Sequence, residues 1–194
     1  MSDLFERCHA FTAKWEGGLT DDAADAGGIT NHGVSIAFLS DLAGRKPGVV
    51  TGAGIALPVT ADTIRRLTAQ QAAQLFRVEF WQPLRCDELP PAVALCLYDM
   101  AVNHGRAGAV KILQRAATIF DPGLAVDGKL GPKTMAVAKR MGSAYAVGII
   151  ANARQRYYDN IVARNPSQHA FLRGWTNRCR AMLSEALGIV GAAE

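Results

Sequence analysis

The chain has 194 residues, of which 49% are hydrophobic and 20% are charged, so it is long enough to fold around a sizeable core. Its formal charge of +4 is small and its lysines and arginines are scattered, which disfavours a nucleic-acid-binding protein. The longest apolar runs are well short of the ~20 residues that a membrane-spanning helix needs. Because the first residues lack the apolar core of a secretory signal peptide, synthesis in the cytoplasm without stable membrane insertion is expected.

The first predicted element is an amphipathic helix that ends near Glu16. Its apolar stripe recurs at helical spacing and consists of Leu4, Cys8, Phe11 and Trp15. Paired glycines then end this helix, and an acidic, glycine-rich loop follows in which a small hairpin can form. A second short helix is expected to begin near Ser35.

Turns and short helices are predicted next. Residues 43–58 contain four glycines and two prolines and no periodic apolar face, so they are expected to form a surface loop at the rim of a cleft. Thr60 is expected to cap a short helix. Thr68 and Gln71 form the pattern of a capping box for the helix that follows, which should stop at the next Trp-Gln-Pro run.

The remaining elements are longer. Pro91 lies in the first turn of an apolar helix that ends at Gly105, and this helix is expected to be the most buried. Further helices are predicted over residues 107–120, from 132 to about 141, over 144–165 and over 167–187, with Trp175 in the core. The chain is therefore predicted to be mainly α. A possible junction near residue 89 divides it into regions 1–88 and 89–194, packed as one globular unit.

The four cysteines are widely spaced, without a CxxC pair or a histidine at metal-ligand spacing, and they are Cys8, Cys86, Cys96 and Cys179. Each lies in an apolar helical context, so they are expected to be buried thiols. His32, His104 and Asp25 lack a ligand-rich motif, and no metal site or cofactor is expected.

Glu16 is the candidate catalytic residue. Hydrolysis of a glycosidic bond needs an acid that protonates the leaving oxygen and a partner that activates water or stabilises the cationic sugar. A carboxyl at the rigid end of a helix is suited to the first role, although its position alone also fits an ordinary solvated glutamate. Asp25 and Thr30 follow it with eight and then four intervening residues, and they are the expected partners.

Two other carboxylates lie in the same loop. Asp21 and Asp22 are alternative partners for Glu16, but aspartates at such positions more often stabilise turns or cap helices. Asp25 is preferred because it lies deeper in the loop, where Thr30 can share a water molecule with it.

These residues resemble the signature of the bacterial and phage N-acetylmuramidases of glycoside hydrolase family 108. The resemblance covers nearly the whole chain, in the segments Glu16–Gly18, Asp25–Gly33, Phe80–Pro83, Leu97–Gly105, Leu113–Ala116 and Asp127–Thr134. It implies a lysozyme-like helical fold with the active site on a small loop or hairpin, Glu16 as the catalytic acid, and a C-terminal peptidoglycan-binding region. By analogy with phage lysozymes, Asp25 and Thr30 complete the catalytic set.

Substrate contacts are expected from four residues. Asp99 and Asn103 lie four apart on one helix face, so they either hydrogen-bond sugar in a cleft or form a buried contact between helices. His32 is expected to line the cleft, and Gln114, in one of the matching segments, to contact substrate. The segment that begins at Asp127 is interpreted as a turn before a helix, with glycan contact secondary.

The predicted function is an endolysin-like N-acetylmuramidase that cleaves the β-1,4 bond between N-acetylmuramic acid and N-acetylglucosamine. A lytic transglycosylase and a non-catalytic peptidoglycan-binding protein are the alternatives. Peptidoglycan glycan strands are the expected partner of a monomeric protein. Because this substrate lies outside the membrane, release through a holin-type pore or a dedicated secretion system is expected to precede action in the periplasm or cell wall.

Overall fold

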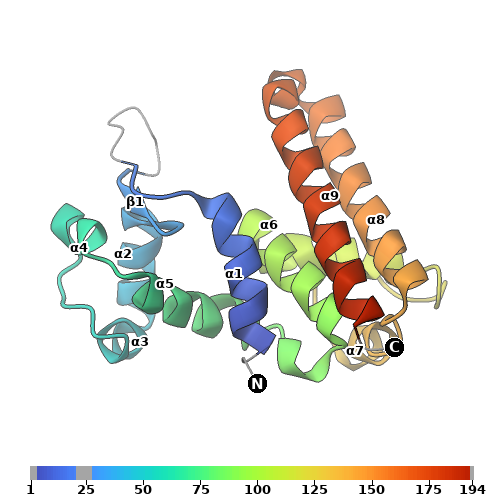
Figure 1. Ribbon diagram of the computed structural model, residues 1–194, viewed down its shortest axis with the longest axis horizontal. Coiled ribbons are helices and arrows are strands. Elements are labelled where there is room, and N and C mark those ends of the chain that lie inside the picture. Colours follow the sequence, from blue (N-terminus) through green and yellow to red (C-terminus); the bar gives the residue numbers. More distant parts are fainter. Residues whose placement is uncertain (1–3, 21–27, 193–194) are drawn as a thin grey trace. The chain divides into compact units, whose positions relative to one another are not determined.

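The computed structural model describes residues 4–20 and 28–192, and it is mainly helical, which confirms the predicted fold class (Figure 1). The chain forms two compact units, residues 1–81 and 82–194. This division falls earlier in the chain than the one expected after residue 88. No helix in the described ranges is long and apolar enough to cross a membrane.

The first unit combines short helices with a two-stranded hairpin. Its elements are α1 (Leu4–Glu16), β1 (Thr30–Asn31), β2 (Val34–Ser35), α2 (Ile36–Arg45), α3 (Pro47–Gly52), α4 (Ala61–Arg65), α5 (Ala69–Phe76) and the π-helical turn η1 (Arg77–Trp81). The strands are antiparallel, with Thr30 opposite Ser35 and Asn31 opposite Val34. The hairpin thus leads directly into α2.

Local capping defines where three of these helices begin. The Ser35 hydroxyl accepts the N–H of Phe38 at the start of α2. Thr60 and Thr68 both form reciprocal capping boxes, where the sequence predicts a cap at Thr60 and a capping box at Thr68. These predictions are confirmed because a cap depends on residues only three positions apart.

Two sequence expectations in this unit are wrong. Residues 43–58 include α3, whose Pro47 lies in the first turn and whose Val50 is fully buried, so the segment is not simply a surface loop. Trp15 is 37% exposed, whereas Phe5 and Thr12 are buried beside Cys8 and Phe11. In the last turns of α1 the buried face is therefore formed by Phe11 and Thr12, and Trp15 of the predicted stripe lies outside it.

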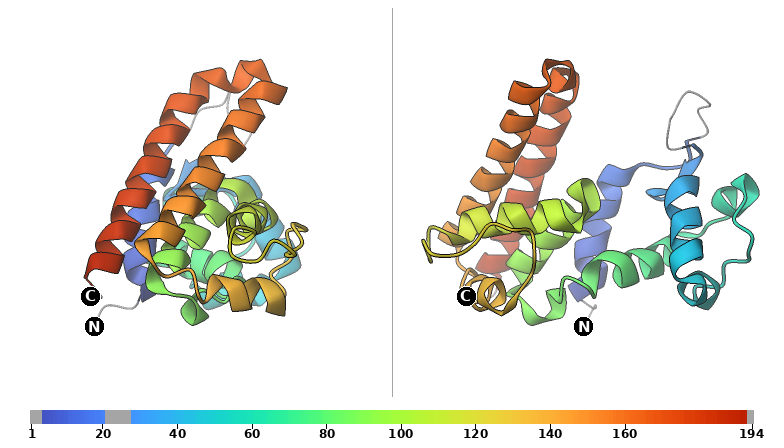
Figure 2. Two further views of the ribbon diagram at one scale, coloured as in Figure 1. Left: turned by 90° about the vertical axis from the view of Figure 1, so that its right-hand side faces the viewer. Right: turned by 180° about the vertical axis from the view of Figure 1, so that it is seen from behind.

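The second unit is built on long helices. Its elements are the 3₁₀ turn η2 (Cys86–Glu88), α6 (Pro91–Ala117), α7 (Pro132–Ala138), α8 (Ala144–Arg164), the 3₁₀ turn η3 (Pro166–Gln168) and α9 (His169–Gly191). The chain turns at η3, so α8 and α9 run side by side in opposite directions, and both pack on α6 (Figures 1 and 2). The first half of α6 is almost completely buried, as expected.

Helix α6 joins two helices that the sequence predicts separately. Gly105 lies at the junction with φ 72° and ψ 158°, which is not a helical conformation. Only glycine adopts this backbone geometry without strain. The helix therefore changes direction at Gly105 and continues to Ala117.

A buried ionic network holds α6, α8 and α9 together. The Asp99 carboxylate receives Arg154 Nη1 at 2.6 Å and Arg178 Nη2 at 2.8 Å, and Asp99 and Arg154 have no exposed surface. Tyr158 accepts a hydrogen bond from Arg154 at 2.8 Å and donates one to Asn103 at 3.0 Å. Burial alone would raise the pKa of Asp99, but the two guanidinium groups lower it below its usual value.

All four cysteines are buried free thiols, which confirms the expectation from their spacing. The Cys179 thiol donates to the backbone carbonyl of Ala151 at 3.3 Å. Phe171, by contrast, is 56% exposed and not in the core. Trp175 is only partly buried, between Phe171 and Tyr158, on which it stacks with ring centroids 5.3 Å apart.

Candidate active site

Glu16 is the last residue of α1. The helix is anchored by its buried residues Phe5, Cys8 and Phe11, and it ends because Gly17 adopts a φ of 77°. The Glu16 side chain is half-buried, and its Oε1 atom is shielded from solvent. A carboxyl at this position is held by a rigid element instead of a loop.

The turn of the hairpin fixes the Glu16 side chain from the other side. A Cβ atom added to Gly33 would lie 2.7 Å from Glu16 Cβ, 3.1 Å from Glu16 Cγ and 3.3 Å from Phe76 Cζ. Gly33 also has a φ of 76°, which disfavours any other residue. The stem of Glu16 therefore packs directly on the backbone of the hairpin turn, and this contact requires glycine.

Thr30 occupies the middle of a small sheet. Its N–H and carbonyl form hydrogen bonds of 2.9 and 2.8 Å with the backbone of Thr20, on the side opposite to Ser35. The Thr30 hydroxyl donates to the Gly28 carbonyl at 3.3 Å, and its side chain is half-buried. Glu16 and Thr30 are thus both positioned by this hairpin.

The remaining loop carboxylates are not described. Asp25, the expected partner of Glu16, and its alternatives Asp21 and Asp22 lie outside the described residues. The structure therefore shows the anchors of the loop, Thr20 and Gly28, and leaves the identity of the second carboxylate a prediction.

Asn31 is an anchor that the sequence analysis missed. Its buried side chain donates to the carbonyl oxygen of Ile64, near the end of α4, at 3.0 Å and to that of Leu67, just after α4, at 3.3 Å. The signal was the Asn-His-Gly run itself, which is typical of a tight turn. His32 lies at that turn, exposed and with a φ of 49°.

Two apolar side chains are exposed near Glu16 in the sequence. Trp15 is 37% exposed and Leu19 is 54% exposed, on either side of the glycines that end α1. An indole that is not buried in the core is free to stack on a ligand, and the faces of sugar rings are apolar enough to bind there. Trp15 therefore lies outside the core stripe, and its exposure beside Glu16 in the sequence makes it a candidate for contact with a sugar ring.

Three of the four side chains expected to contact substrate lie in hydrogen-bonded networks of the second unit. Asp99 is fully buried and neutralised by Arg154 and Arg178, so the alternative of a buried contact between helices is the one observed. Asn103 joins the same network through Tyr158 and Arg154 Nη2, the latter at 3.3 Å, but it is only partly buried.

Gln114 is also buried, with 1% of its surface exposed. Its Nε2 donates to Asp127 Oδ1 at 2.9 Å and to the Lys129 carbonyl at 3.0 Å, and its Oε1 accepts the Gly128 N–H at 2.8 Å. Gln114 therefore holds the turn before α7 in place. The expected substrate contact does not fit a side chain that is enclosed and fully hydrogen-bonded.

His104 lies beside the ionic network of the second unit. Its ring packs on Tyr157 and Tyr158 at centroid distances of 4.8 and 5.1 Å, and its buried Nε2 has no hydrogen-bond partner among the described residues. Burial, with the nearby guanidinium groups of Arg154 and Arg178, lowers the pKa of His104 to about 3. The ring is therefore neutral near pH 7.

The chain is similar to known proteins over nearly its whole length. A family model described as glycosyl hydrolase 108 matches residues 9–105, and one described as a predicted peptidoglycan domain matches residues 108–180. The solved structure of Brucella abortus SagA is 29% identical, with a TM-score of 0.74 over 96% of this chain and 95% of that chain. No curated protein sequence matches the chain. The two matched regions meet at the change of direction in α6.

Proposed function

Because the chain belongs to the glycosyl hydrolase 108 family and is a glycoside hydrolase that acts on peptidoglycan, we propose that Glu16 is its general acid. The observation that carries this proposal is the packing of the Glu16 stem on the backbone of Gly33. The contact leaves the carboxyl little freedom, and general acid catalysis needs a carboxyl held within hydrogen-bond reach of the leaving oxygen.

The reaction follows from this placement. Glu16 donates its proton to the oxygen that bridges N-acetylmuramic acid and N-acetylglucosamine, the bond from this oxygen to the anomeric carbon of the muramic acid breaks, N-acetylglucosamine leaves with the protonated oxygen, and positive charge develops on that anomeric carbon. Thr30 and Asp25, on the hairpin and its loop, orient the attacking water or stabilise that charge. Trp15 supplies an aromatic face for a sugar ring, and His32 a polar group at the turn.

Replacement of Glu16 by glutamine tests the central assignment. The Glu16→Gln variant should keep its helical circular dichroism spectrum and lose at least ~100-fold in the rate at which it clears purified peptidoglycan, because the amide cannot donate the proton. Glu6→Gln is the matched control, since Glu6 is an exposed glutamate on the same helix. Clearing by Glu16→Gln at the rate of the unmodified protein would refute the assignment.

The products of the reaction provide an independent check. Hydrolysis adds water to the muramic acid end, whereas a lytic transglycosylase leaves an anhydro-sugar of lower mass. Mass spectrometry of the released fragments is expected to show the hydrated product. A mixture made only of anhydro products would keep Glu16 as the acid but remove the attacking water from the mechanism, and Asp25 and Thr30 could then only stabilise the positive charge.

The route to the substrate is a separate part of the proposal. The protein is proposed to act as a monomer, in the periplasm or cell wall, after release through a holin-type pore or a dedicated secretion system, because peptidoglycan lies outside the membrane. Cells that express the protein with a pore-forming holin should lyse, and cells that express it alone should not. Lysis of both cultures at the same rate would contradict this route.

A further inference from the structure

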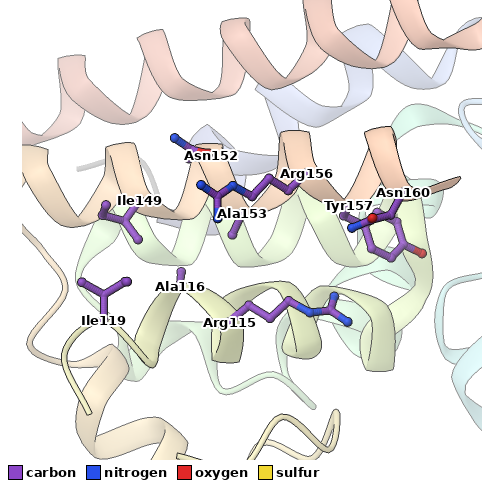
Figure 3. Close-up of a pocket in the computed structure, with 9 residues that line it drawn as sticks. All are labelled: Arg115, Ala116, Ile119, Ile149, Asn152, Ala153, Arg156, Tyr157 and Asn160. Carbon is purple, nitrogen blue, oxygen red and sulfur yellow. The ribbon is translucent and has the colours of Figure 1, made fainter. Parts of the chain in front are cut away.

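A groove on the second unit lies between the C-terminal half of α6 and helix α8, and Figure 3 shows the side chains that line it. Its volume is about 320 Å³. Arg115 comes from the last turn of α6 and Ile119 from the turn that follows this helix, and α8 provides Ile149, Asn152, Arg156 and Asn160, with Tyr157 beside them. These residues all lie within the region that matches the predicted peptidoglycan domain.

Helical spacing explains why these side chains share one face. Asn152, Arg156 and Asn160 are four residues apart on α8, so they lie one above another. Arg115 lies in the last turn of α6, and Ile119 follows in the turn after the helix ends at Ala117. The groove is therefore built on two rigid helices that pack against each other.

The groove is positively charged. Its lining contains two arginines and no acidic residue, and neither guanidinium pairs with a carboxylate among the described residues. Elsewhere in the same unit, Arg85, Arg154 and Arg178 all have carboxylate partners. Two unneutralised guanidinium groups facing one groove are suited to bidentate recognition of carboxylates.

The two ends of the groove differ in polarity. Ile119 and Ile149 lie at one end, and Tyr157 and Asn160 at the other (Figure 3). Next to the apolar end, the exposed rings of Phe120 and Tyr145 pack edge to face, with centroids 6.2 Å apart. The groove thus offers cations, amide groups and an apolar end within one small volume.

We propose that this groove binds the carboxylate-bearing peptide stems of peptidoglycan and so anchors the enzyme on its substrate. The proposal rests on peptidoglycan being the substrate. In an intact wall the lactyl carboxyl of muramic acid is bonded to the stem as an amide, so the free carboxylates are those of the peptides. The asparagine amides match the peptide backbone, the apolar end matches alanine methyl groups, and a volume of about 320 Å³ holds a few amino acids instead of a glycan strand.

Binding to purified sacculi tests this proposal, with the Glu16→Gln variant as the starting protein so that the substrate is not degraded. The added double substitution Arg115→Gln and Arg156→Gln should weaken binding about tenfold, since each exposed ion pair contributes modestly. Arg173→Gln with Arg180→Gln removes the same charge from exposed positions on α9 and should leave binding unchanged. An equal loss from both double substitutions would show a net-charge effect and overturn the proposal.

Two modified substrates identify the chemical group that is bound. Sacculi whose carboxylates have been converted to amides should bind the starting protein weakly, and the Arg115→Gln and Arg156→Gln substitutions should then have no further effect. Glycan strands stripped of their peptides, with the lactyl carboxyls that this frees also converted to amides, should bind weakly too. Full-strength binding to stripped strands would overturn the assignment to peptide stems.

Catalysis separates this proposal from that for Glu16. With Glu16 intact, the protein carrying Arg115→Gln and Arg156→Gln should still cleave stripped glycan strands at the normal rate. Its cleavage rate should fall only on peptidoglycan that carries peptide stems. The two arginine pairs are compared in the same Glu16→Gln background, so any cleavage left in that background would act on both alike, and the difference in binding between them would still test the groove. Loss of cleavage on both substrates would refute the anchoring role.

Discussion

Two carboxylates of this protein have opposite environments, and the comparison shows what makes one of them available for chemistry. Asp99, in the second unit, is fully buried and neutralised by two arginines on neighbouring helices. Glu16, in the first unit, is half-buried at a helix end and positioned by a close backbone contact with Gly33. Asp99 is held by two buried guanidinium groups, whereas Glu16 is positioned by the packing of its stem on the backbone of Gly33.

Substitution of Asp99 is expected to have the largest effect on stability. Asp99→Asn should lower the free energy of unfolding by about 3–5 kcal/mol, because it leaves Arg154 and Arg178 buried without their counter-charge. Urea unfolding measures this loss. Glu16→Gln should change stability by about 1 kcal/mol or less. If the two substitutions destabilised the protein equally, the contrast between a structural and a catalytic carboxylate would fail.

Gly33→Ala should break the positioning of Glu16. The new methyl group would overlap the Glu16 stem in a backbone conformation that alanine avoids, with an expected loss of about 2 kcal/mol and a fall in kcat of about 100-fold. Gly17→Ala is the matched control, because Gly17 has nearly the same φ and no atom within 4 Å of the added Cβ. The control should lose about 1 kcal/mol and little kcat. Equal kcat losses would show that the contact with Glu16 is unimportant.

A pH titration of stability sharpens the description of the ionic network. The pKa of His104 is about 3 in the folded protein and near 6.5 in the unfolded chain, so only the unfolded chain takes up this proton between those values. The contribution that neutral His104 makes to the free energy of unfolding is therefore fully present above pH 6.5 and is lost as the pH falls toward 3. His104→Gln should reduce the drop in Tm between pH 7 and 5 by a few degrees. An unchanged drop would mean that other groups cause it.

The sequence predicts the features of this protein that depend on nearby residues. The capping boxes of Thr60 and Thr68 and the end of α1 at Glu16 follow from patterns within a few positions. The family resemblance, spread over many short motifs, predicts the enzyme class that the comparisons support.

The errors concern packing between segments far apart in the chain. The spacing of Asp99 and Asn103 shows that they share a helix face, but not that arginines 55 and 79 residues later meet that face. The sequence does not predict helix α3, because two of its six residues are glycines. Its helical conformation is stabilised by the burial of Val50 in the folded unit and not by intrinsic helix propensity. Trp15 fits the helical spacing of apolar residues in α1, but this spacing does not show at which residue of the helix the core ends.

The bend at Gly105 has a consequence for how this protein tolerates changes in length. The two regions that match separate families meet inside one helix, with no flexible linker between them. Each successive residue of an α-helix is rotated by about 100° around the helix axis. One residue inserted or deleted near the bend would therefore rotate every later side chain of α6 onto a different face of the helix. Residues around the bend can be substituted during evolution. The number of residues between Asp99 and Gln114 is expected to be constant among relatives that keep both the ionic network of Asp99 and the hydrogen bonds of Gln114.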